Sequence, residues 1–176
     1  IVSRRQRQMC IRDSTMIAPN NRYVNDAKVA QAAAAMLSKI GIKVDLKTMP
    51  KAQYWPEFDK CAADMLLIGW HADTEDSANF NEFLTMTRNE ETGRGQYNCG
   101  HYSNPEMDKV VEAANVETDP AKRAAMLKGV EATLYNDAAF VPLHWQSEAW
   151  GAKSNVKAAD IVNPMVMPYF GDLVVE

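Results

Sequence analysis

The sequence lacks several features that would place a protein in a common class at once. No apolar run approaches the roughly 20 residues that a membrane-spanning helix needs. Basic charge is not in excess, since 19 Lys and Arg stand against 23 Asp and Glu, so no nucleic-acid partner is expected. The first residues also lack the apolar segment of a secretory signal peptide.

Motifs that hold a catalytic nucleophile or a phosphate are absent as well. There is no Gly-x-Ser-x-Gly turn and no P-loop. The groupings His71-x-Asp73-x-Glu75 and Cys99-x-His101 lack a recognised metal-ligand spacing. Taken as a calcium loop from Asp73, the segment has no glycine at its sixth position and no glutamate at its twelfth. We therefore expect no catalytic residue, no metal site and no cofactor.

The first fourteen residues differ from the rest of the chain. They read IVSRRQRQMCIRDS, which is basic and has no apolar period. They could be a disordered tail, but the run from Met9 to Ser14 resembles a translated sequencing adapter, which is the interpretation we favour. In either case we expect residues 1–14 to contribute nothing to the fold and residues 15–176 to form it. The 176-residue chain, 47% hydrophobic, is long enough for one domain with a core.

From Thr15 onward the pattern predicts a strand, a helix and a second strand. The first strand covers residues 15–18. Asn25 is a favourable helix cap, and apolar residues at helical spacing follow it until Gly41 ends the helix. Residues 42–47 then alternate between apolar and charged, as in a strand with one face in water. This order is that of a βαβ unit. A second helix is expected between residues 48 and 60, with Pro56 in its first turn or at a kink.

The stretch from Ala63 to Asp76 is the centre of the interpretation. Its apolar run leads to Gly69-Trp70 and predicts a core strand over residues 64–70, buried on both faces. Histidine and carboxylates follow at once: His71, Asp73, Glu75 and Asp76. In open α/β sheets, ligands bind outside the carboxyl ends of strands. The end of this strand is therefore the candidate binding site.

The second half of the chain reads mainly as helices. Ser77 can cap a short helix, a long loop is expected over residues 87–104, and two helices follow from about residues 105 and 120. Residues 140–146 then predict a strand, and residues 149–152 a second short one. The predicted fold class is α/β, with a βαβ-containing sheet flanked by helices.

The segment Gly69-Trp70-x-x-Asp73 after an apolar strand resembles the ligand-cleft segment of periplasmic dipeptide- and oligopeptide-binding proteins. These are the family 5 solute-binding subunits of ABC importers. The order and spacing of further segments carry the same resemblance over about residues 15–176: Asn25-Asp26-Ala27, Gly41-Ile42-Lys43-Val44, Tyr102 to Glu106, Asp119 to Arg123, and Val141-Pro142-Leu143.

The resemblance implies the C-terminal lobe of a type II (cluster C) periplasmic binding protein, with the N-terminal lobe missing from this chain. It implies a peptide or other small-molecule ligand, an ABC permease as partner, and a monomer when full-length. The protein would be periplasmic, or lipid-anchored outside the cell. A dipeptide, a longer peptide, an amino sugar, an opine and a metal chelate all stay open as ligands.

The resemblance also assigns roles to individual residues. The aspartate that matches Asp73 is implied to hold the ligand's ammonium group, which would need a carboxylate once it is buried between two lobes. Trp70, between Gly69 and His71, either forms a wall of the cleft or packs in the core. Glu75 and Asp76 would be solvated or cap a helix.

Two questions stay open from the sequence. Cys61 and Cys99 could form a disulfide in the periplasm, but sequence alone gives no geometry for the pair. The alternative function is a small α/β hydrolase or metal-dependent enzyme that uses His71, Asp73 and Glu75. The missing nucleophile and metal spacing argue against it.

Overall fold

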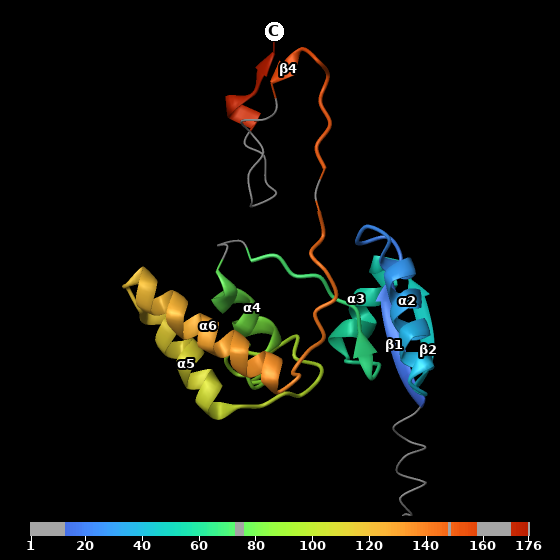
Figure 1. Ribbon diagram of the computed structural model, residues 1–176, viewed down its shortest axis with the longest axis horizontal. Coiled ribbons are helices and arrows are strands. Elements are labelled where there is room, and N and C mark those ends of the chain that lie inside the picture. Colours follow the sequence, from blue (N-terminus) through green and yellow to red (C-terminus); the bar gives the residue numbers. More distant parts are fainter. Residues whose placement is uncertain (1–12, 73–75, 148, 158–169, 176) are drawn as a thin grey trace, which may run out of the picture. The chain divides into compact units, whose positions relative to one another are not determined.

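The computed structural model describes residues 13–72, 76–147, 149–157 and 170–175 (Figure 1). The chain forms two compact units. The first contains the described residues up to Trp70 together with Cys99–His101. The second contains His71–Asn98 and the chain from Tyr102 onward. The sheet with its two helices belongs to the first unit, and helices α4, α5 and α6 belong to the second.

The first unit is built on a three-stranded parallel sheet in the order β2-β1-β3. The central strand β1 (Asp13–Pro19) pairs along its whole length with β2 (Lys43–Met49), and α2 (Asp26–Lys39) connects the two. The βαβ unit predicted from the sequence is thus present. Met16, Ile17 and Ala18 of β1 are buried, because β1 has a strand on each side and Ala30 of α2 packs on it.

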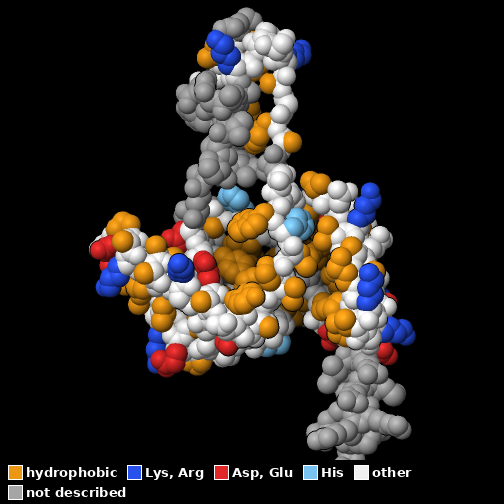
Figure 2. All heavy atoms as spheres, viewed as in Figure 1, with side chains coloured by type: hydrophobic (Ala, Val, Ile, Leu, Met, Phe, Trp, Pro, Cys, Tyr) orange, Lys and Arg blue, Asp and Glu red, His pale blue; other side chains and the backbone are white. Residues whose placement is uncertain are grey.

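Helix α2 covers the sheet with small residues and leaves larger ones outside. Its sequence is rich in alanine, and Ala30 is fully buried. Met36 and Ile40, by contrast, are 65% and 73% exposed, and hydrophobic side chains are seen at the surface over α2 in Figure 2. Gly41, at a φ of 85°, ends the helix in the left-handed conformation that glycine adopts without strain.

The strand predicted over residues 64–70 is much shorter than expected. Strand β3 is confined to Met65–Leu66, pairs only with β1, and is partly exposed rather than buried on both faces. The physical reason is its position at an edge of the described sheet. Its register is fixed just before it begins: the Asp64 carboxylate accepts hydrogen bonds from the Thr15 backbone N–H and hydroxyl, both at 2.8 Å.

The beginning of the fold also differs from the prediction. Strand β1 begins at Asp13, so Asp13 and Ser14 belong to the sheet, opposite Lys43 and Val44, and not to a tail. These two residues join the ladder because β2 begins at Lys43, which lies opposite Asp13. Residues 1–12 lie outside the described residues, and for them the expected tail stays a prediction.

Helix α3 (Lys51–Asp59) follows β2 in the stretch predicted to be helical, and Pro56 lies inside it, past the first turn where it was expected. Its aromatic side chains Tyr54 and Phe58 are buried, with Trp55 packed edge-on against both. The Tyr54 hydroxyl donates a 2.6 Å hydrogen bond to the carbonyl of Leu67. Burial raises the pKa of this phenol, so it stays protonated as a donor. The bond ties α3 to the chain just after β3.

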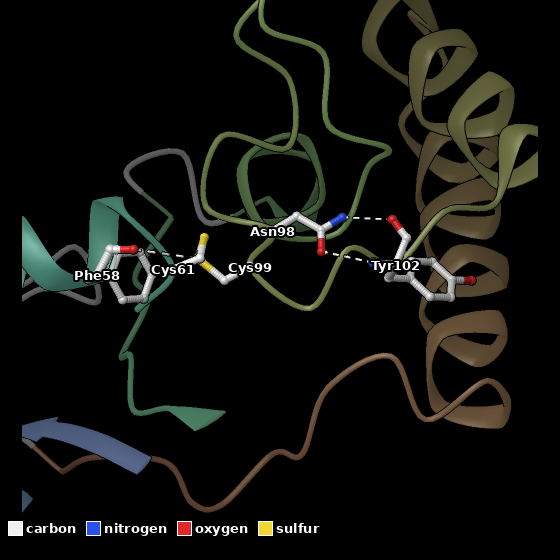
Figure 3. Close-up of a disulfide and its surroundings, with 5 residues drawn as sticks. All are labelled: Phe58, Cys61, Asn98, Cys99 and Tyr102. Carbon is white, nitrogen blue, oxygen red and sulfur yellow. Dashed lines mark hydrogen bonds between the residues drawn. A yellow bond between two sulfur atoms is a disulfide. The ribbon is translucent and has the colours of Figure 1, made fainter. Parts of the chain in front are cut away.

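Cys61 and Cys99 form a disulfide with their Cα atoms 5.2 Å apart (Figure 3). This answers the question that the sequence left open. The bond joins the chain after α3 to the short segment Cys99–His101, which groups with the first unit. Cys99 Sγ also lies 3.5 Å from the carbonyl oxygen of Phe58. The disulfide therefore closes a loop that contains β3, Gly69-Trp70 and α4.

Asn98, just before the disulfide, organises the neighbouring turn. Its side chain is buried and donates to the carbonyls of Met86 and Tyr102, at 3.0 and 2.8 Å. The Tyr102 N–H donates back to the Asn98 side-chain oxygen at 3.1 Å. The two bonds with Tyr102, which Figure 3 draws, satisfy both backbone polar groups of the residue that follows the segment Cys99–His101.

The second unit is a helical assembly of α4 (Ser77–Leu84), α5 (Pro105–Val116) and α6 (Pro120–Asn136). The long loop expected between α4 and α5 is present, with one isolated bridge between Asn89 and Arg94. The main core of the unit consists of five buried apolar residues from this loop and the two longer helices: Met86, Met107, Val111, Val130 and Leu134.

Each helix of the second unit begins at a side chain that caps it. Asp76, and not the expected Ser77, caps α4 by accepting from the Ala78 N–H at 2.8 Å. Asn104 caps α5, and Asp119 caps α6. A carboxylate at this position satisfies orphan N–H groups and interacts favourably with the helix dipole. Capping was one of the two roles expected for Asp76, and it is the one that the structure shows.

The strands predicted after α6 are absent from the described residues. Residues 140–147 are exposed and assigned to no strand, and neither are residues 149–152. The short antiparallel pair that does form joins β4 (Val156–Lys157) to β5 (Val174–Val175), with a 3-10 turn, η2 (Phe170–Asp172), before β5. An alternating pattern makes a strand only where a neighbouring strand can accept its hydrogen bonds.

Candidate binding site at the carboxyl edge of the sheet

The carboxyl ends of the three parallel strands lie at one edge of the sheet, because all three run in the same direction. The loop from Asn20 to Tyr23 follows β1, and Gly69-Trp70 lies shortly after β3. The Asn20 N–H donates to the carbonyl of Met49, the last residue of β2, at 3.0 Å. The Asn21 side chain accepts from the N–H of Lys51, the first residue of α3, at 2.7 Å. The loop after β1 is therefore held against its neighbours.

Tyr23 and Gly69 are also in contact at this edge. The Tyr23 hydroxyl donates to the Gly69 carbonyl at 3.3 Å. A Cβ atom added to Gly69 would lie 2.9 Å from a ring carbon of Tyr23, closer than real Cβ atoms come to other atoms. Glycine is thus required here for close approach rather than for a special φ. The contact sets where the chain goes immediately before Trp70.

Asp26 holds the loop that presents Tyr23. One carboxylate oxygen accepts from the N–H groups of Arg22 and Tyr23 at 2.9 and 3.0 Å, and the other from the Ala27 N–H at 2.8 Å. Burial acts to raise the pKa of Asp26, but the three backbone donors outweigh it, so its pKa is lowered. The expected cap, Asn25, makes no side-chain capping bond and has a φ of 56°. Asp26, in the first turn, accepts a hydrogen bond from a backbone N–H at the start of the helix instead.

Arg22 brings a positive charge to the same edge. Its guanidinium carbon lies 5.3 Å from the centre of the Tyr23 ring, a cation–π distance. The Arg22 residue is exposed. An exposed guanidinium on an aromatic face suits an anionic group such as a carboxylate, which it can bind with two parallel hydrogen bonds.

The residues predicted from the sequence fall in different places. Gly69 and Trp70 belong to the first unit. Trp70 is partly buried, which fits both roles expected for it, a wall of the cleft and packing in the core. His71 is exposed and belongs to the second unit. Asp73 and Glu75 lie outside the described residues, so the ammonium-binding role of Asp73 stays a prediction.

Asp76 is the first described residue after positions 73–75, and it is held by an ion pair. Its carboxylate pairs with the Arg123 guanidinium, with Nε to Oδ2 at 2.8 Å and Nη2 to Oδ1 at 3.1 Å. The hydrogen bonds from Arg123 are the main reason that the pKa of Asp76 is lowered. Arg123 also donates to the Ala114 carbonyl near the end of α5. One guanidinium thus joins the start of α4, the end of α5 and the first turn of α6.

Sequence reasoning missed the residues that follow β1, namely Asn21, Arg22 and Tyr23. The rule that led to residues 69–76, that ligands bind beyond the carboxyl ends of strands, applies equally to the end of the first strand. The rule would have indicated residues 20–23 as candidates. It could not have predicted their contact with Gly69, because that contact joins residues 46 positions apart.

Two features of the described residues bear on the class of site. Within the described part of the chain, no group of three or more His, Cys, Asp or Glu side chains could hold a metal ion. Over the same residues, no helix is long and apolar enough to cross a membrane.

Comparison with solved structures identifies the fold. The murein tripeptide binding protein MppA of Escherichia coli is 24% identical, with a TM-score of 0.76 over 93% of this chain and 30% of that chain. The putative peptide-binding protein AppA of Clostridium difficile is 22% identical, with a TM-score of 0.75 over 94% of this chain and 34% of that chain. The chain therefore has the α/β fold of part of a type II periplasmic binding protein, as expected from the sequence.

The family follows from the sequence comparison. A model of the bacterial extracellular solute-binding proteins, family 5 Middle, matches residues 4–91, half of the chain, and the chain belongs to this family. Among curated relatives, the oligopeptide-binding protein OppA of Bacillus subtilis (strain 168) is 28% identical over 148 residues. That alignment covers 84% of this chain but 25% of the relative. The chain thus spans about a quarter of the length of the curated relatives it matches.

Proposed function

We propose that this chain is part of the substrate-binding component of an ABC importer. The complete protein binds a peptide or similar small solute between two lobes and delivers it to a permease in the membrane. Residues 15–176, with Asp13 and Ser14 of the first strand, represent the C-terminal lobe. The protein performs no chemistry on its ligand, and the lobes close by hinge bending.

One observation carries the proposal: the loop 20–23 and the segment Gly69-Trp70 meet at the carboxyl edge of one parallel sheet. Ligands of open α/β sheets bind at this edge. The edge combines an aromatic ring, a guanidinium and backbone groups, and these can contact a small polar solute without reacting with it. Family membership supports the same function.

A peptide has an ammonium group at one end and a carboxylate at the other, and we assign a partner to each. Asp73 is the proposed partner of the ammonium group. Arg22 is the proposed partner of the carboxylate, since its guanidinium is exposed beside Tyr23 at the same edge. Trp70 packs against the ligand between these ends, with Gly69 and His71 beside it. Burial between two lobes strengthens both charged pairs.

The cellular setting follows from the same proposal. The protein works outside the cytoplasm, in the periplasm or lipid-anchored at the cell surface, as a monomer that docks on the permease. The Cys61–Cys99 disulfide supports this location, because disulfides form and persist in oxidising compartments.

The test measures ligand binding by the complete protein, obtained by following the reading frame outward from this chain. Titration calorimetry compares a di- to tetrapeptide with its N-acetylated and its C-amidated forms. We expect the free peptide to bind best, and each blocked form to lose at least tenfold in affinity. If blocked and free peptides bind equally, the proposed roles of Asp73 and Arg22 are wrong. If no peptide binds, the ligand belongs to another chemical class.

A matched pair of variants isolates the carboxylate contact. In Arg22→Gln, the acid and amide forms of the peptide should bind with nearly equal affinity, because the group that distinguishes them is gone. Lys39→Gln removes an exposed charge at the other end of α2 and should leave the distinction intact. Hydrolysis of the peptide that disappears in His71→Ala would instead support the enzyme alternative based on His71, Asp73 and Glu75.

A further inference from the structure

The chain leaves the sheet immediately before Gly69-Trp70. Strand β3 ends at Leu66, and the last bond to β1 runs from the Leu67 N–H to the Ile17 carbonyl, at 3.2 Å. Residues 67–72 belong to no helix, turn or strand. A segment of this kind keeps one conformation only if groups outside a strand ladder bind its backbone.

Two tyrosine hydroxyls bind the backbone of this segment at alternate residues. Tyr54 donates to the Leu67 carbonyl at 2.6 Å, and Tyr23 donates to the Gly69 carbonyl at 3.3 Å. The two carbonyls are two residues apart, so in an extended chain they point to the same side, as they do toward a neighbouring strand. The hydroxyls therefore take the place of the N–H donors that a strand would supply.

The two tyrosines are held by different elements of the first unit. Tyr54 is fully buried in α3, with the centre of the Phe58 ring 5.7 Å from its own. Tyr23 is partly exposed, and Asp26 at the start of α2 accepts from its N–H at 3.0 Å. The two bonds thus fix the backbone up to Gly69 relative to both helices. A binding residue is placed precisely when the groups that support it are themselves fixed.

We propose that Tyr54 and Tyr23 are positioning residues, which hold the backbone before Trp70 in the conformation that the binding site uses. Through it they set how well the site selects a peptide with a free ammonium group. The inference rests on the proposed function, since it takes Trp70 and Asp73 as ligand contacts. Trp70 follows Gly69 directly and Asp73 comes three residues later, so a change in the path of the chain at Gly69 displaces both. The energy of a charged pair depends on the distance between its members, so selectivity for the ammonium group falls with such a displacement.

The two hydroxyls differ in what can replace them. Tyr54 is buried, so Tyr54→Phe leaves the Leu67 carbonyl facing a ring in place of a donor. The bond from Tyr23 is exposed, so water can take over its role in Tyr23→Phe. We therefore expect the larger effect from Tyr54→Phe. Tyr102→Phe is the matched control, because the Tyr102 hydroxyl also donates at 2.6 Å, to Asp137 in the second unit.

Titration calorimetry of the complete protein with trialanine and N-acetyl-trialanine measures the selectivity. We expect the ratio of the two affinities to fall by about tenfold in Tyr54→Phe and by about threefold in Tyr23→Phe, and to stay unchanged in Tyr102→Phe. If the wild type discriminates and Tyr54→Phe keeps the full ratio, the proposal is overturned. An equal fall in Tyr102→Phe would overturn it as well, because the effect would then follow from a general loss of stability.

Hydrogen exchange of the complete protein tests the positioning without a ligand. The Leu67 amide is the reporter, because its bond to Ile17 belongs to the residue whose carbonyl Tyr54 holds. We expect Tyr54→Phe to speed its exchange about tenfold and to leave the Asn20 amide, which bonds to Met49 in the same sheet, unchanged.

The two measurements separate this inference from the proposed function. Unchanged exchange of the Leu67 amide in Tyr54→Phe would overturn the positioning role, whatever the peptides show. Faster exchange of that amide, together with a wild type that binds the free and the acetylated peptide equally, would remove the proposed ammonium contact and leave the positioning role in place.

Discussion

Arg123 pairs with Asp76 through two hydrogen bonds, with Nε 2.8 Å from Oδ2 and Nη2 3.1 Å from Oδ1. Both side chains are about three-quarters buried. The pair joins Asp76, the N-cap of α4, to the first turn of α6. The same arginine also bonds the Ala114 carbonyl, so its removal would leave a carboxylate and a backbone carbonyl without their donor.

Replacing Arg123 should therefore destabilise the second unit. We expect Arg123→Met to lower the free energy of unfolding by about 2 kcal/mol, within the range for hydrogen bonds to charged groups. Lys122→Met is the matched control. Lys122 is a neighbouring cation whose side chain is 67% exposed and pairs with Glu117, so its loss should cost under about 1 kcal/mol. Urea denaturation measures both, and equal losses would show that the Arg123 network has no special weight.

The contribution of this pair should depend on pH in a defined direction. The pKa of Asp76 is lowered from 3.8 in the folded protein, mainly by Arg123. A lowered folded pKa gives stability that is fully present above the unfolded pKa and is lost as the pH falls through the folded value. The difference in unfolding free energy between wild type and Arg123→Met should thus be constant from pH 7 to 5 and shrink below about pH 4. A difference that grows on acidification would contradict the assignment.

The Cys61–Cys99 disulfide should contribute strongly to stability. It closes a loop with a sequence separation of 38, for which the chain-entropy model gives about 4 kcal/mol. We expect the Cys61→Ser, Cys99→Ser double variant to lose about 2–4 kcal/mol, and dithiothreitol to have the same effect on the wild type. Cys10→Ser is the control and should change nothing, since residues 1–12 are expected to lie outside the fold. Stability unaffected by reduction would show that the noncovalent contacts suffice.

Gly69→Ala tests the close approach of Tyr23. The added methyl would meet the Tyr23 ring at 2.9 Å, so Tyr23 must move and its bond to the Gly69 carbonyl is disturbed. We expect a loss of about 1–3 kcal/mol in stability, as for overpacked positions, and weaker ligand binding by the complete protein. Gly129→Ala in α6 is the control: its added Cβ meets no atom within 4 Å. It should stabilise the helix by up to about 1 kcal/mol.

Local patterns were enough to predict much of the fold. The βαβ unit of β1, α2 and β2 was predicted because its signals are local. A short apolar run indicates β1, helical spacing that ends at Gly41 indicates α2, and alternating apolar and charged residues indicate β2. The caps were predicted less well, because Asp26 and Asp76 replace Asn25 and Ser77 through the detailed course of the backbone before each helix. A capping motif indicates where a helix begins more reliably than which atom caps it.

Features that depend on distant partners could not be predicted. The apolar run from Met65 to Ile68 has the composition of a buried strand, but its burial depends on neighbours, and β1 is its only strand partner in the described sheet. Residues 140–147 have an alternating pattern as well, but they form no strand among the described residues. For the site, Gly69 and Trp70 were expected at the carboxyl end of β3 and lie shortly after it, while their binding role stays a prediction. Tyr23 and Arg22 were missed, because long-range packing brings them there.

The central claim is that the complete protein holds a peptide by its charged ends at this sheet edge, with Asp73 binding the ammonium group. Titration calorimetry of Asp73→Asn in the complete protein tests it most directly, because asparagine keeps the shape and removes the charge. We expect the affinity for a free peptide to fall by roughly 30- to 5000-fold, from the about 2–5 kcal/mol that loss of a buried charged partner costs. Glu75→Gln, two residues away, should cost much less. An Asp73→Asn protein that binds the free peptide as tightly as wild type would contradict the account.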